Sequence, residues 1–210
     1  MDILRGNPFD IVQIYCLLDV CRQRNIARGD RYEMQSEEQL VWMEENMQIR
    51  LREMSEKEFK VFFEYSVNDY ANDLVKSANI TMGEALMQAK GEFAEMLPNG
   101  VSSKDNALRI IVDAVEEKVV GVIWYLFEMT DGIKQVFLSD FIIKEEERRK
   151  GYASVALTEM EQDAKKNGCT ESIIYVWKHN LPGINLYTKC GYGVFKELDD
   201  GMYMKKGIKE

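Results

Sequence analysis

The sequence of 210 residues is poor in metal-binding side chains. It contains one histidine, His179, and none of its four cysteines forms a C-x-x-C pair. Structural zinc sites need several closely spaced Cys or His ligands, so we expect no metal site. The cysteines are interpreted as reduced, partly buried thiols, and Cys190 as a residue of helix packing.

The chain also lacks long apolar runs. No run reaches the length of a transmembrane helix, and Asp10 and Asp19 interrupt the one apolar stretch near the N-terminus, where a signal peptide would lie. We therefore expect a cytoplasmic protein without a membrane partner.

Basic residues are fewer than acidic ones. There are 27 Lys and Arg residues against 36 Asp and Glu, a formal net charge of −9. This balance argues against non-specific nucleic-acid binding and favours cationic over anionic substrates. With 46% hydrophobic residues, the chain can bury the core of one large domain, or of one domain plus an appendage.

The N-terminal part differs from the rest. Residues 9–20 form a dense apolar run that predicts a buried helix, and residues 35–46 predict a second, shorter helix. Because this part is too small to fold alone, we interpret residues 1–46 as a helical extension of a domain at 47–210. The apolar run fits two roles, a homodimer surface or a cap over the main domain.

The domain alternates between strand-like and helix-like segments. Two capping-box patterns, Ser55 with Glu58 and Thr81 with Glu84, mark the starts of the first two helices. The patterns predict helices over residues 55–76, 81–97, 153–167 and 182–190, and strands over residues 47–54, 108–115, 119–129, 133–143, 172–177, 193–197 and 202–206. In the first strand Ile49, Leu51 and Glu53 share one face. The result is a mixed α/β domain with an antiparallel meander.

A short basic loop precedes the third helix of this domain. It reads Arg148-Arg149-Lys150-Gly151-Tyr152-Ala153. A glycine followed by a small residue allows close approach of the backbone, and the N–H groups at a helix start attract anions. The loop is thus either a phosphate cradle or a solvated basic turn. Glu145, Glu146 and Glu147 precede it, and they either weaken its positive field or form a solvated turn whose charges pair locally.

Two motifs in this order resemble the GCN5-related N-acetyltransferases. The first is Arg148-x-x-Gly151-x-Ala153, and the second is Asn180-x-x-Gly183-Ile184-x-Leu186-Tyr187-x-x-x-Gly191-Tyr192. The similarity covers about residues 47–208 and is greatest to the generic bacterial branch that includes ribosomal-protein N-terminal acetyltransferases. It implies the acyl-CoA N-acyltransferase fold, in which a largely antiparallel central sheet is flanked by helices and splays apart at the cofactor slot.

The resemblance implies acetyl-CoA as cosubstrate. Backbone N–H groups of the basic loop would hold its pyrophosphate, and the strand before the loop would pair with the pantetheine arm. The residues implied are Phe141, Ile143, Arg148, Arg149, Lys150, Gly151, Tyr152, Ala153 and Asn180. The Tyr152 side chain is expected to point away from the cofactor. Asn180 is equally a helix cap, and both roles can hold at once.

Tyr187 matches the general acid of the family, which protonates the departing thiolate. A phenol titrates near pH ~10 and can donate a proton at neutral pH; the alternative is a core aromatic residue. Asp140 is the candidate base, and its alternative is a partner for a basic side chain or a backbone turn. Glu128 is a weaker candidate base, and His179 is more typical of a surface or capping residue.

The function implied is direct transfer of the acetyl group to a primary amine of a small molecule or a peptide N-terminus. Residues 68–100 would form the acceptor wall, and they include Asp69, Asp73, Glu84, Glu92 and Glu95. These acids indicate a cationic amine, although helix-surface charge explains them as well. The alternative function is a non-catalytic acyl-CoA-binding regulatory protein, with residues 1–46 docking a partner. A P-loop enzyme is excluded because no Lys-Ser or Lys-Thr follows Gly151.

Overall fold

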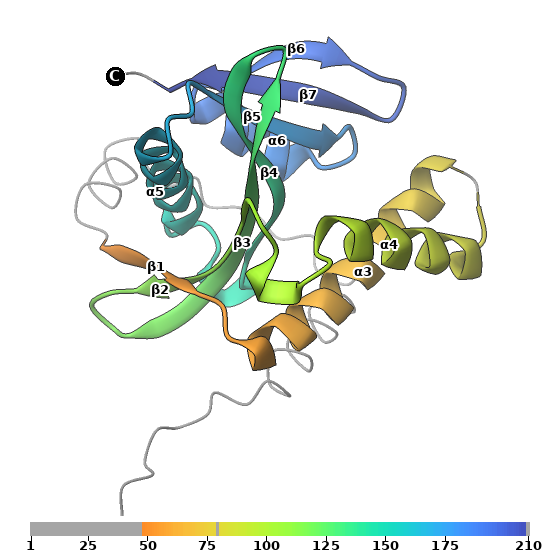
Figure 1. The fold of residues 1–210 in the computed structure, drawn as a ribbon, viewed down its shortest axis with the longest axis horizontal. Coiled ribbons are helices and arrows are strands. Elements are labelled where there is room, and N and C mark those ends of the chain that lie inside the picture. The colour runs from red at the N-terminus through yellow and green to blue at the C-terminus, as the bar shows by residue number, and fades with distance from the viewer. Residues whose placement is uncertain (1–47, 79, 209–210) are drawn as a thin grey trace, which may run out of the picture.

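The computed structural model describes residues 48–78 and 80–208 (Figure 1). The predicted extension at 1–46 lies outside the described residues, as do Met47, Cys16 and Cys21. The strands are β1 (Ile49–Glu53), β2 (Asn106–Asp113), β3 (Lys118–Thr130), β4 (Ile133–Ile143), β5 (Glu171–Trp177), β6 (Gly193–Glu197) and β7 (Gly201–Gly207). The helices are α3 (Glu56–Ala78), α4 (Met82–Met96), α5 (Tyr152–Lys166) and α6 (Leu181–Lys189), with short 3₁₀ turns at Gly100–Ser102 and Glu145–Glu147.

All seven strands belong to one sheet in the order β1-β2-β3-β4-β5-β7-β6. Every neighbouring pair is antiparallel except β4 and β5, which run parallel. The parallel pair is joined through α5, as a crossover connection requires. The mixed, largely antiparallel α/β fold expected from the sequence is therefore confirmed.

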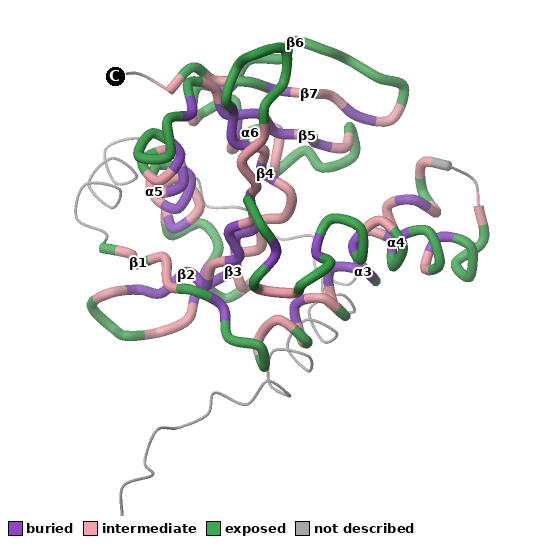
Figure 2. Tube along the Cα trace, in the orientation of Figure 1, coloured by how far each residue is buried: buried purple, intermediate pink, exposed green. Residues whose placement is uncertain are grey.

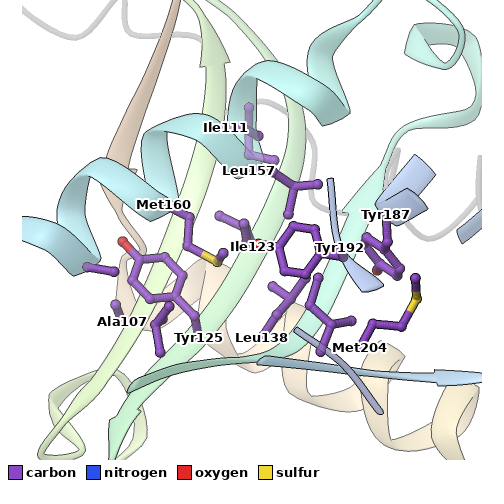
Figure 3. Packing of buried hydrophobic residues seen from close by; sticks show 14 of the residues in the cluster. Ala107, Ile111, Ile123, Tyr125, Leu138, Leu157, Met160, Tyr187, Tyr192 and Met204 are labelled. Atoms are coloured by element: carbon purple, nitrogen blue, oxygen red, sulfur yellow. The ribbon is translucent and has the colours of Figure 1, made fainter. Parts of the chain in front are cut away.

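Helices cover the sheet from two sides, and each side has its own core. Helices α3 and α4 lie together on one face, and α5 lies on the other (Figure 1). On the α5 side, Leu157 and Met160 point toward Ile123 and Leu138 of the sheet (Figure 3). The core on the opposite side includes Phe62, Phe93 and Trp124; the rings of the latter two lie 5.3 Å apart. Buried positions recur along the inner sides of α3 and α5 (Figure 2).

The predicted helix starts are confirmed. Ser55 and Glu58 form reciprocal hydrogen bonds before α3, and Thr81 and Glu84 do so before α4. These bonds satisfy N–H groups that a helix leaves unpaired at its first turn. None of the described helices is long and apolar enough to cross a bilayer.

The first strand alternates as expected. Ile49 and Leu51 pack against the α5-side core, while Glu53, at the end of the strand, is exposed. Strand β1 is the edge of the sheet. The neighbouring Arg52 binds Glu58 at the start of α3, with a Nη2–Oε1 distance of 2.6 Å.

Two irregularities in β4 open the sheet. Opposite β3, Trp124 pairs with Asp140 and Tyr125 with Leu138, so Ser139 is an additional residue in a bulge. Opposite β5, pairing covers only Gln135–Leu138 and ends there. Among the described residues, the part of β4 after Leu138 has no partner strand on its β5 side. Strands β4 and β5 therefore separate at the bulge, as expected for a splayed sheet.

Candidate active site

The basic loop places main-chain N–H groups at the start of α5. Arg149 and Gly151 have φ angles of 65° and 92°, both in the left-handed region. The first helical hydrogen bond runs from Val155 N to Gly151 O, at 3.3 Å. The N–H groups of Tyr152 and Ala153 precede that bond and have no partner within the helix. Such alternating backbone with N–H groups at a helix start suits a phosphate group.

The Tyr152 side chain packs against the sheet. It is buried, and its hydroxyl donates a hydrogen bond of 2.5 Å to Oδ2 of Asp113 at the end of β2. That this side chain points away from the cofactor stays a prediction. Its bond fixes the first residue of α5 to the sheet.

The acidic turn before the loop is solvated only in part, because Glu146 is exposed whereas Glu147 is only 2% exposed. Its carboxylate binds the Nζ atoms of Lys118 and Lys150, the latter at 2.9 Å. Burial would raise the pKa of Glu147, but the two ammonium groups outweigh burial and hold the pKa below its usual value. Lys150 therefore stabilises the loop internally, and its charge is partly balanced by Glu147. Arg148 also turns back, donating from Nε to the Ile143 carbonyl at 3.0 Å.

Phe141 and Ile143 lie in the part of β4 that has left β5. They pair with Ile123 and Gly121 of β3 and are half-buried against the α5-side core. Because β5 does not pair here, this edge of β4 can pair with an extended ligand by strand addition. A Cβ atom on Gly121 would lie 2.3 Å from the Ile142 carbonyl oxygen, so only glycine fits opposite this segment.

Asn180 caps α6, as one of its two interpretations predicted. Its Oδ1 accepts a hydrogen bond of 3.0 Å from the Gly183 N–H group. A Cβ on Gly183 would lie 2.7 Å from Asn180 Nδ2, which explains glycine at this position. The Asn180 side chain is exposed, so its contact with a cofactor stays a prediction.

Asp140 directly follows the bulged residue Ser139, at the point where β4 and β5 part. Its Oδ2 accepts a hydrogen bond of 2.5 Å from the Ser66 hydroxyl of α3. Burial, together with the nearby Asp69 carboxylate, raises the pKa of Asp140 to about 6, although hydrogen bonds from Ser66 and the Phe141 N–H group lower it. The carboxyl group therefore titrates much nearer to neutral pH than an ordinary aspartate.

Tyr187 faces the same region from α6. It is buried, beside Tyr192 and close to Met204 (Figure 3), with the two tyrosine rings 6.2 Å apart. Burial and then the negative charge of Asp140 raise the pKa of the Tyr187 phenol. The phenol is thus protonated over the whole physiological range and lies within the field of the Asp140 carboxylate. Its interpretation as a core aromatic residue also holds, because Tyr187 belongs to the α5-side core.

The two weaker candidates lie elsewhere. Glu128 accepts a hydrogen bond of 2.6 Å from Gln135 Nε2, at the β4 end that still pairs with β5. His179 is exposed, stacks on Trp177 with ring centroids 6.0 Å apart, and contacts Asp73 Oδ1 through Nε2 at 3.0 Å. The contacts of Glu128 and His179 are thus with Gln135, Trp177 and Asp73, whereas Ser66 hydrogen-bonds Asp140.

Two acids of the predicted acceptor wall are engaged within α4. Glu84 is used in the capping box of α4, and Glu92 accepts a hydrogen bond of 2.9 Å from Gln88 Nε2. The ring of Tyr70 on α3 lies 6.3 Å from that of Trp177 on β5. Sequence reasoning missed the contributions of Ser66, Tyr70 and Trp177. A signal existed for Ser66, because this polar residue occupies a helical position on the apolar stripe of α3.

The seven-stranded mixed sheet, which opens between β4 and β5 and has α5 as the crossover between these two strands, has the architecture of the acyl-CoA N-acyltransferase fold. The profile of the Acetyltransferase (GNAT) family matches residues 71–192. The protein belongs to this family.

Relatives of known sequence and structure agree with this assignment. YycN, an uncharacterized N-acetyltransferase of Bacillus subtilis, is 30% identical over 159 residues, which cover 76% of this chain and 99% of YycN. YdgE of the same organism, also an uncharacterized N-acetyltransferase, is 29% identical over 148 residues, 70% of this chain and 94% of YdgE. The similarity to ribosomal-protein N-terminal acetyltransferases stays a prediction.

Solved structures share the fold. The crystal structure of Bacillus subtilis YycN has a TM-score of 0.64 at 29% identity, covering 72% of this chain and 94% of that one. PaiA N-acetyltransferase of Thermoplasma acidophilum, solved with coenzyme A, has a TM-score of 0.58 at 20% identity, covering 77% of this chain and 99% of that one.

The chain is therefore an acetyl-CoA-dependent N-acetyltransferase acting on an amine. The residues present fit acetyl-CoA, because the helix start at Gly151 offers N–H groups to phosphate and the free edge of β4 offers backbone groups to an extended arm.

Proposed function

We propose that Asp140 and Tyr187 are the base and the acid of direct acetyl transfer to a primary amine, and that the basic loop and β4 hold acetyl-CoA. Acetyl-CoA supplies an acetyl group activated as a thioester. The observation that carries the proposal is the position of Asp140 directly after the bulge, where β4 and β5 part, with its charge acting on the buried Tyr187 phenol of α6.

The two environments suit opposite proton transfers. Asp140, with a pKa of about 6, is largely ionised at neutral pH yet more basic than an ordinary carboxylate, so it can accept the proton that the attacking amine loses. Tyr187 stays protonated and can donate its proton to the sulfur as the carbon–sulfur bond breaks. The carbon–nitrogen bond forms in the same complex, so no covalent enzyme intermediate is needed.

The acceptor that suits the wall is a cationic amine of a small molecule or a peptide N-terminus. Asp69 and Asp73 lie on the face of α3 that looks toward Asp140 and His179. Tyr70 and Trp177 add aromatic faces beside them. Carboxylates next to aromatic rings attract cations by charge and by cation–π interaction. A spermidine N-acetyltransferase of Vibrio cholerae solved with spermine shares the fold at 14% identity and a TM-score of 0.53.

The catalytic roles are tested by comparing Tyr187→Phe with Tyr192→Phe. The two tyrosines are neighbours in one core, but the Tyr192 hydroxyl binds Ser172 and Glu161. We expect Tyr187→Phe to lower kcat by at least about 100-fold with an unchanged Kd for acetyl-CoA. Tyr192→Phe should lower the free energy of unfolding and keep kcat. Full turnover by Tyr187→Phe would refute the acid role.

The acceptor class is tested with matched amines. We expect a linear diamine to have a KM at least about tenfold lower than a monoamine of the same carbon chain, with the difference shrinking at high salt. Peptides with basic and neutral N-terminal sequences extend the comparison. Equal KM values across these pairs would count against a cationic acceptor and leave the catalytic roles untouched.

A further inference from the structure

Ser66 is a buried hydroxyl on the face of α3 that meets the sheet. The residue is 2% exposed, and its Oγ lies 2.5 Å from Asp140 Oδ2 although the two are 74 residues apart in sequence. No helix-stabilising role explains a serine here, since serine is a poorer helix former than alanine. Its hydroxyl is committed to the carboxylate on β4.

We infer that Ser66 is a positioning residue for the catalytic carboxylate: its hydroxyl fixes the orientation of Asp140 and stabilises the ionised form that accepts the proton. The inference rests on the proposed role of Asp140 as the base. A hydroxyl that donates to an ionised carboxylate makes a strong, short hydrogen bond. Asp140 directly follows the bulged residue Ser139, where β4 no longer pairs with β5, and the Ser66 hydroxyl holds its side chain from outside the sheet.

The groups around Asp140 act in opposite directions. From α3, the Asp69 carboxylate disfavours ionisation of Asp140, and Ser66 favours it. On β4 itself, the Phe141 N–H group favours ionisation of Asp140. On α6, the phenol of Tyr187 is close enough that the Asp140 charge raises its pKa. Loss of the Ser66 hydroxyl should therefore raise the pKa of Asp140.

The position of Ser66 also ties the base to the acceptor wall. One turn further along the same face of α3, Tyr70 contacts Trp177 on β5, and one turn beyond that, Asp73 contacts His179. Helix α3 thus spans the opening, with Ser66 on the β4 side and these two residues on the β5 side. A rigid helix that joins Asp140 to the acceptor wall holds the bound amine at a fixed position relative to the carboxylate.

The test is the pH dependence of kcat/KM in Ser66→Ala, with Ser66→Thr as the variant that keeps the hydroxyl. We expect the acid limb of Ser66→Ala to move up by roughly one pH unit, a loss of about tenfold in kcat/KM below pH 6, and Ser66→Thr to restore the wild-type limb. Ser172→Ala is the matched control, because Ser172 is also a fully buried serine but binds Tyr192. It should not move the limb.

A carboxyl ¹³C titration of Asp140 by NMR gives a readout that does not depend on turnover. A higher pKa of Asp140 in Ser66→Ala supports the inference even when activity is low. If Asp140→Asn is inactive but Ser66→Ala changes neither the acid limb nor the NMR pKa, the inference about Ser66 is wrong, and the role of Asp140 as the base still holds. If Asp140→Asn keeps full activity, the proposed base itself fails.

Discussion

The Tyr152 hydroxyl donates to Asp113 Oδ2 at 2.5 Å and so joins the first residue of α5 to the last residue of β2. Burial would raise the pKa of Asp113, but the bonds from Tyr152 and from the Val115 and Glu116 N–H groups outweigh it and lower the pKa. The helix start that offers N–H groups to phosphate is therefore held from behind by a charged hydrogen bond.

Tyr152→Phe should lower the free energy of unfolding by about 1.5–3 kcal/mol, the usual worth of a hydrogen bond to a charged group. Because the folded pKa of Asp113 is depressed, its stabilisation is present above the unfolded pKa and is lost as the pH falls through the folded pKa. The difference from wild type in urea unfolding should thus shrink in acid.

Tyr125→Phe is the matched control for Tyr152→Phe. Its hydroxyl donates to Asp163 Oδ2 at 2.6 Å, near the C-terminal end of α5 rather than at the loop. Both variants should be destabilised, but only Tyr152→Phe should weaken acetyl-CoA binding, measured by calorimetry. Equal acetyl-CoA affinities in the two variants would show that the bond does not hold the loop.

The order of elements was predictable because each has a local signal. Capping boxes mark the starts of α3 and α4, and Asp131-Gly132 marks the turn between β3 and β4, where both residues have positive φ. The departure came from a long-range effect. Glu147 was expected in a solvated turn but is buried, and Lys118, distant in sequence, balances its charge from β3.

Asp140→Asn should stabilise the fold while it removes activity. Asp140 is an acid whose folded pKa, about 6, lies above the usual value, so ionisation at neutral pH costs folding free energy. This cost grows as the pH rises from the unfolded pKa to about 6. We expect the Asn variant to gain about 1–3 kcal/mol at pH 8 and much less at pH 4, measured by urea unfolding.

Glu58→Gln provides a control of opposite sign. Burial would raise the pKa of Glu58, but Arg52 and Ser55 lower it to about 2. Its stabilisation is present above the unfolded pKa and is lost as the pH falls through about 2. Glu58→Gln should therefore destabilise at pH 8, and the difference should shrink in acid. A gain in stability for both variants at pH 8 would contradict the argument.

The loop backbone allows main-chain and side-chain binding to be separated. Arg149 has a φ of 65°, which costs a residue with a Cβ about 1 kcal/mol, whereas Gly151 adopts 92° without that cost. Arg149→Gly should raise the free energy of unfolding by about 0.5–1 kcal/mol, and Gly151→Ala should lower it by at least that much.

Thermal unfolding of these two variants with acetyl-CoA then reports how the cofactor is bound. If N–H groups hold the pyrophosphate, Arg149→Gly keeps the wild-type shift, and Gly151→Ala loses most of it. A lost shift in Arg149→Gly would assign the binding to the guanidinium instead. ATP serves as the control for generic phosphate binding.

The site was predictable where a motif names a residue and was missed where only the fold brings residues together. Tyr187 and Asp140 belong to recognisable segments, and the structure brings both to the parting of β4 and β5. Ser66 and Tyr70 carry no motif. Ser66 is marked only as a polar residue on the apolar stripe of α3, and the partners of both residues, on β4 and β5, follow from the packing of α3 against the sheet.

The contact between Asp73 and His179, at 3.0 Å, closes the far side of the proposed acceptor wall. It joins α3 to the segment after β5, and Lys76 also binds Asp73 at 2.7 Å. Asp73→Asn removes the charge but keeps the size of the side chain. We expect it to raise the KM of a cationic amine about three- to tenfold and to leave kcat and acetyl-CoA affinity nearly unchanged, because Asp73 lies away from the reacting groups.

Glu95→Gln is the matched control for Asp73→Asn, since Glu95 is an exposed acid at the end of α4 in the same predicted wall. It should leave the KM unchanged, which separates local recognition from net charge. Steady-state kinetics with a diamine and with the monoamine of equal length complete the test. If both variants raise the KM equally, long-range attraction rather than the α3 face recognises the amine. If Asp73→Asn lowers kcat and leaves the KM unchanged, Asp73 acts on the chemistry and the wall has been misassigned.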